Sequence, residues 1–102
     1  MLKHIVLLTW QDGTTEAQIA EVGDSLGHLV ATIDAIYSYD YGVDMGLVQG
    51  NSDYSIVAEF LTEADFFAYA KHPEHKRFVS EIVQPIVATS NAMQFHIDAD
   101  DA

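Results

Sequence analysis

Two histidines, a tyrosine and three basic side chains gather in the ten residues from Tyr69 to Phe78, which read Tyr-Ala-Lys-His-Pro-Glu-His-Lys-Arg-Phe. Imidazole and phenol groups exchange protons and donate hydrogen bonds, so they suit acid–base chemistry on a carbonyl compound. Pro73 after His72 predicts a helix start, because proline suits the first helical position. His75 then lies in the first turn, where the positive end of the helix dipole can bind an anion or tune an imidazole.

The charge of the chain excludes several partners. Its 102 residues carry a formal net charge of −12, whereas nucleic acids and anionic membranes need a basic face that neutralises phosphate. We therefore expect neither a nucleic acid nor a membrane as a partner. The apolar run near the N-terminus is too short to span a bilayer and lacks a cleavage site for secretion, so a cytoplasmic protein is expected.

The residue types also limit the chemistry. The chain has no cysteine, which excludes disulfides, thiol catalysis and zinc–thiolate sites. Apart from a weak grouping around Glu74, the histidines have no compact spacing with Asp or Glu, so no metal is expected. Ser-His-Asp patterns, phosphate-binding glycine loops and dinucleotide fingerprints are absent, and we expect no cofactor.

Hydrophobic periodicity predicts the elements that position these residues. Residues 3–10 alternate as a strand with one face made of His4, Val6, Leu8 and Trp10. Helical spacing follows over 16–33, with a capping box at its start. Further strands are predicted at 35–42, 54–61 and 93–97, and a helix from about residue 62 that breaks at the His72–Pro73 step and restarts.

This order predicts an α+β fold of the ferredoxin-like βαββαβ type, with a four-stranded antiparallel sheet and helices on one face. It forms a single domain over 1–102, with a core at about 3–97 and an acidic tail at 98–102. The strand at 3–10 is apolar on both faces, and helices cover only one. Because a bare apolar face marks an association surface, we expect a homodimer packed through its sheet faces.

The strand motif His4 to Leu8, and the junction motif formed by Tyr69, His72, Pro73, His75 and Phe78, resemble the Dabb family. These are stress-responsive α/β-barrel domains of the dimeric α+β barrel superfamily. The likeness runs from about Lys3 to Ile97. It implies a ferredoxin-like monomer whose sheet pairs with a second sheet to form a barrel-like dimer.

The family includes a plant polyketide cyclase that closes an aromatic ring by aldol condensation, and the resemblance implies functional roles for its matching residues. The cyclase's first-strand histidine, junction tyrosine and second junction histidine correspond to His4, Tyr69 and His75. Tyr54 stands where that cyclase has a further histidine, and a phenol is a far weaker base at neutral pH.

We therefore predict a catalytic group of His75, Tyr69 and His4. The predicted ligand pocket between sheet and helices adds Tyr54, Val6, Trp10 and Phe78. It would bind a small apolar or aromatic carbonyl compound for cofactor-free acid–base chemistry. Two alternatives stay open, namely a non-catalytic stress-associated dimer with structural histidines, and a cofactor-independent monooxygenase of the same superfamily.

Each of these residues also has a structural interpretation. His75 suits a core or capping histidine, His4 a strand-end histidine bonded to main chain, and His72 a helix cap. The basic residues of the junction would either attract a ligand carboxylate or balance acidic surface groups.

Overall fold

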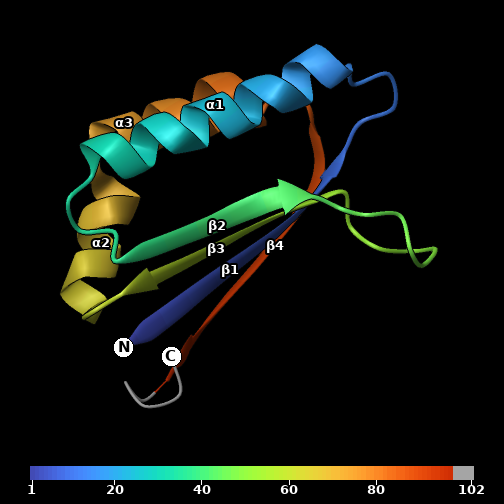
Figure 1. Cartoon of the computed structure of the whole chain (residues 1–102). Coiled ribbons are helices and arrows are strands. Elements are labelled where there is room, and N and C mark those ends of the chain that lie inside the picture. The colour runs from blue at the N-terminus through green and yellow to red at the C-terminus, as the bar shows by residue number, and fades with distance from the viewer. Residues whose placement is uncertain (98–102) are drawn as a thin grey trace.

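The computed structural model describes residues 1–97, so the predicted acidic tail lies outside the described residues. Four strands form one sheet, and the helices lie together on one of its faces (Figure 1). The elements in chain order are β1 (Leu2–Trp10), α1 (Glu16–Thr32), β2 (Ser38–Val43), β3 (Tyr54–Phe60), α2 (Glu63–Lys71), α3 (Pro73–Arg77), a π-helical turn η1 (Phe78–Val83) and β4 (Val87–His96).

The sheet has the strand order β2-β3-β1-β4, with every neighbouring pair antiparallel. This arrangement confirms the predicted ferredoxin-like fold. The alternation predicted for β1 is also confirmed, because Leu8 is 2% exposed on the helix side while Leu7 is 41% exposed on the opposite side.

The helix face of the sheet holds the core. Phe60 and Ala58 of β3 are fully buried there, against a row of apolar residues on α1 made of Val22, Leu26 and Leu29. Thr15 caps α1 through the predicted capping box, because its hydroxyl accepts from the Gln18 N–H and the Gln18 amide oxygen accepts from the Thr15 N–H.

The helical segment between β3 and β4 is broken as predicted. His72 adopts an extended backbone between α2 and α3, and its Nδ1 accepts a hydrogen bond from the Glu74 N–H at 3.1 Å. The predicted capping role of His72 is therefore confirmed. α3 passes directly into η1, where the Gln84 N–H donates to the Val79 carbonyl five residues earlier at 2.9 Å.

Two predicted strand boundaries were wrong. β2 begins at Ser38 instead of residue 35, and Tyr37 is 59% exposed before the strand. β4 begins at Val87 instead of residue 93. The first half of β4 is an edge strand that backbone hydrogen bonds hold to β1. Its mostly polar residues show no apolar alternation, so the sequence pattern did not reveal it.

The outer face of the sheet carries exposed apolar side chains. Leu7 of β1 lies there with Met93 and Phe95 of β4, which are 56% and 40% exposed. The loop between β2 and β3 projects from one end of the sheet (Figure 1). Within residues 1–97 no helix is long and apolar enough to cross a bilayer.

Candidate functional site

Four residues form one row across the helix face of the sheet. Tyr39 of β2 pairs with Ala58 of β3, Ala58 pairs with His4 of β1, and His4 pairs with Gln94 of β4. Ala58 projects only a methyl group, so a gap lies between the larger side chains of Tyr39 and His4.

Tyr69 of α2 fills the space over this gap and is 3% exposed. Its ring centroid lies 6.0 Å from that of Tyr39, 6.3 Å from that of His4 and 4.3 Å from that of His75. The hydroxyl oxygens of Tyr69 and Tyr39 are 2.6 Å apart, which is a hydrogen bond. The structure thus brings together the three residues predicted to be catalytic, His4, Tyr69 and His75.

His75 is fixed in one tautomer by the backbone. Its Nδ1 lies 3.3 Å from the carbonyl oxygen of Ala70, which can only accept a hydrogen bond. Nδ1 therefore carries the hydrogen, and Nε2 of the neutral ring keeps a lone pair that can accept a proton. Burial lowers the pKa of His75, and the Ala70 carbonyl opposes part of that effect.

His4 is held the opposite way. The amide nitrogen of Gln94 donates to Nδ1 of His4 at 2.8 Å, so the hydrogen of the neutral ring is on Nε2. Burial and, second, the charge of His75 lower the pKa of His4. Both imidazoles are therefore neutral at pH 7. Nε2 of His75 can accept a proton, and Nε2 of His4 can donate a hydrogen bond.

Tyr69 supplies an acid between them. Burial raises its pKa to about 12, against an opposing effect of the hydrogen bond with Tyr39. The phenol stays protonated at neutral pH and can donate to a carbonyl oxygen. A neutral base, a neutral N–H donor and a phenol in contact can together carry out proton transfer without a metal or cofactor.

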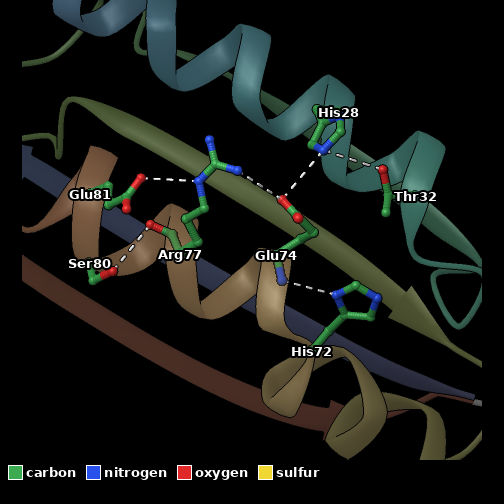
Figure 2. Close-up of polar contacts among 7 residues, drawn as sticks. All are labelled: His28, Thr32, His72, Glu74, Arg77, Ser80 and Glu81. Carbon is green, nitrogen blue, oxygen red and sulfur yellow. Dashed lines mark hydrogen bonds and ion pairs between the residues drawn. The ribbon is translucent and has the colours of Figure 1, made fainter.

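The basic residues of the junction form an outer rim. Figure 2 shows Glu74 between His28 of α1 and Arg77, with its carboxylate 3.5 Å from the His28 Nε2 and 3.7 Å from the Arg77 Nη1. Arg77 also donates to Glu81 at 3.1 Å. These exposed pairs neutralise Arg77, so it is not a free anion-binding group.

The four predicted pocket residues do not lie together. Trp10 and Tyr54 are in ring contact at 5.7 Å, at the far end of β1 from His4, which is about 20 Å for six strand residues. Val6 is half-buried between His4 and Trp10 on the same strand face. Phe78 lines a recess of about 360 Å³ between α1 and α3.

The larger recess lies between α1 and β2. It has a volume of about 550 Å³ and is lined by Tyr41, Tyr54, Val43 and the helix residues Ile19 and Gly23. Its wall is mostly apolar. Neither this recess nor the one beside Phe78 is lined by His4, Tyr69 or His75.

Sequence reasoning missed two site residues, Tyr39 and Gln94. Each touches the site because of the sheet register, which pairs residues up to 94 positions apart. Tyrosines alternate at 37, 39 and 41 within the strand predicted at 35–42, which places Tyr39 on one face but does not identify Tyr69 as its partner. Among residues 1–97 no group of three or more His, Asp or Glu side chains is arranged to hold a metal ion.

The family described as Stress responsive A/B Barrel Domain, Dabb, matches residues 2–97. The chain belongs to this family. A curated relative is the stress-response A/B barrel domain-containing protein HS1 of Arabidopsis thaliana. It is 25% identical over 81 residues, which span 78% of this chain and 74% of that protein.

Solved structures share the Dabb fold of this chain. A dimeric ferredoxin-like protein of unknown function from Thermobifida fusca is 36% identical, with a TM-score of 0.87 over 94% of this chain and 90% of that one. The hydroxynitrile lyase of Passiflora edulis is 19% identical, with a TM-score of 0.84 over 96% and 94% of the two chains. The second likeness shows the fold alone.

Proposed function

We propose that this Dabb protein binds a small, neutral carbonyl compound between its sheet and helices and transfers protons on it without a cofactor. The observation that carries the proposal is that His4 and His75, which both contact Tyr69, are held in opposite tautomers. His75 has a lone pair at Nε2 and His4 has an N–H at Nε2, and the rings of both histidines lie against the ring of Tyr69.

The roles follow from these protonation states. His75 would remove a proton from the carbon next to the carbonyl group, while Tyr69 or His4 donates to the carbonyl oxygen as negative charge develops there. The lowered pKa values of both histidines leave no cation at the site. The site therefore suits a neutral ligand better than a carboxylate. The net charge of −12 on the chain also disfavours an anionic ligand.

The recess between α1 and β2 is the entrance that we propose. Tyr54 and Tyr41 line it, and Tyr41 is in ring contact with Tyr39, which in turn touches Tyr69. Next to it, Trp10 lines a further recess, and its indole N–H has no acceptor within residues 1–97. An apolar ligand with an oxygen acceptor fits this lining, and rotation of Tyr41 would open a path from the recess toward the Tyr39–Tyr69 pair.

The working unit that we propose is a homodimer joined through the outer sheet faces. Leu7, Met93 and Phe95 give this face an exposed apolar surface, which monomers rarely keep bare. The Thermobifida fusca structure, with the same fold and 36% identity, is described as dimeric.

A second candidate is a non-catalytic dimer in which the histidines are structural. The close packing around Tyr69 favours it, because Phe60 and Phe66 contact the same cluster at ring distances of 5.1 and 5.0 Å. The recess between α1 and β2 and the recess beside Phe78 are not lined by residues of this cluster. Against this second candidate, a hydroxynitrile lyase with this fold is a precedent for catalysis on the scaffold.

A binding test separates the two. Acetophenone, a neutral aromatic ketone, should raise the melting temperature of the wild-type protein and broaden the NMR signals of Tyr69. His75→Gln should abolish both effects, whereas His96→Gln, on an exposed strand position, should keep them. Equal binding by the two variants would remove His75 from the site. If a panel of neutral ketones, aldehydes and β-diketones all fail to bind the wild type, the non-catalytic candidate holds.

A further inference from the structure

The hydroxyl of Tyr39 lies 2.6 Å from that of Tyr69. Tyr39 comes from the edge strand β2 and Tyr69 from α2, 30 residues further along the chain. A contact this short between two phenols requires one of them to donate and the other to accept.

We propose that Tyr39 is a positioning residue, which donates to the Tyr69 oxygen and leaves the Tyr69 hydrogen free for the ligand's carbonyl oxygen. The inference rests on the proposed function, and it assigns the acid of that site a fixed partner. A phenol has one hydrogen, so a Tyr69 that donated to Tyr39 would have none left for the ligand.

The surroundings of the two hydroxyls favour this direction. Burial raises the pKa of both phenols and that of Tyr39 further than that of Tyr69, so Tyr39 keeps its hydrogen more firmly. Tyr39 also has no histidine in ring contact, whereas Tyr69 has His4 and His75. Proton exchange with the histidines thus runs through Tyr69, and Tyr39 serves as the donor behind it.

The sheet register explains how Tyr39 reaches this place. Tyr39 and His4 both pair with Ala58, from opposite sides. The small Ala58 lets the Tyr69 ring lie between them, so its hydroxyl meets Tyr39 while its ring meets His4. A donor on the rigid sheet holds the phenol oxygen in place while charge develops on it, which is the arrangement that stabilises a reacting acid.

The test places 3,5-difluorotyrosine at position 69, which lowers the phenol pKa into a range where the fold survives, and follows its ionisation by fluorine NMR. Tyr39→Phe keeps the ring and removes only the donor. We expect this variant to lower the acid dissociation constant Ka at position 69 by about tenfold or more, which means a higher pKa, because a hydrogen bond to the ionised oxygen is lost. Tyr37→Phe, at a 59% exposed position two residues away, should leave the constant unchanged.

An unchanged constant in Tyr39→Phe would overturn the proposal. In the second part, acetophenone affinity should fall about tenfold in Tyr39→Phe relative to Tyr37→Phe. Equal affinity would also overturn the positioning role while the proposed function stands. The fluorine titration needs no ligand, so it decides the Tyr39–Tyr69 bond even if acetophenone fails to bind the wild type, a result that would count against the proposed function alone.

Discussion

The ring of Tyr69 lies against the imidazole of His75, with centroids 4.3 Å apart and planes inclined by 45°. Tyr69 is in the last turn of α2, and His75 is in the first turn of α3. They meet because the extended backbone at His72 turns the chain between the two helices. The junction, and not the rigid sheet, therefore sets the position of His75.

The cap of α3 should matter for stability. His72→Ala removes the acceptor for the Glu74 N–H, and loss of a side-chain cap costs about 1 kcal/mol. Urea denaturation should show a lower midpoint with an unchanged slope, and the NMR signals of Tyr69 should shift because His75 moves. His96→Ala, at an exposed position of β4, is the matched control. Equal midpoints for the two variants would mean that the cap contributes nothing.

Two phenylalanines should differ sharply in their contribution to the core. Phe60 is fully buried and contacts Tyr69, whereas Phe67 is 52% exposed on α2. Phe60→Ala should destabilise the fold by roughly 3–5 kcal/mol through the cavity it leaves. The same change at Phe67 should cost about 1 kcal/mol or less. Calorimetric unfolding of both variants measures the difference, and similar losses would contradict the assigned core.

Much of the fold could be predicted from the sequence because its signs are local. The alternation in β1 marks which face meets the helices, and Pro73 is itself the first residue of α3. Thr15 and Gln18 form the predicted capping box within four residues. The contact between His4 and the junction could also be inferred, because His4 is on the face of β1 that lies under the helices.

What could not be predicted depends on register. The contacts of Tyr39 with Tyr69 and of Gln94 with His4 follow from pairings across the sheet, and local residue patterns do not encode a one-residue shift of an edge strand. The residues of the polar first half of β4 and of the π-helical turn at Phe78–Val83 do not strongly favour the secondary structure that they adopt. The predicted site combined His4 in its catalytic group with Trp10 in its pocket, although these two residues lie six positions apart along β1.

The outer sheet face should hold the dimer together. Met93→Lys places a charge among exposed apolar residues of that face, next to Ile5 across the β1–β4 pair. Burying an unpaired ammonium group in an interface is strongly unfavourable, so this variant should sediment as a monomer at micromolar concentration. Met45→Lys makes the same change at an 82% exposed position on the β2–β3 loop and should remain dimeric. A wild-type protein that sediments as a monomer would refute the face-to-face dimer.

The buried histidines should make the fold less stable as the pH falls below about 6.5, the ordinary pKa of an unfolded histidine. The pKa values of His4 and His75 are lowered in the folded state, chiefly by burial, so the unfolded chain takes up protons first and stability drops between pH 7 and pH 5. The slope contributed by each histidine cannot exceed about 1.4 kcal/mol per pH unit, because one ring takes up at most one proton. His75→Gln should flatten this slope in urea denaturation at pH 7, 6 and 5, while His96→Gln should preserve it. Parallel slopes for wild type and His75→Gln would show that His75 is as easily protonated in the folded chain as in the unfolded one, and would remove the neutral base on which the proposed chemistry depends.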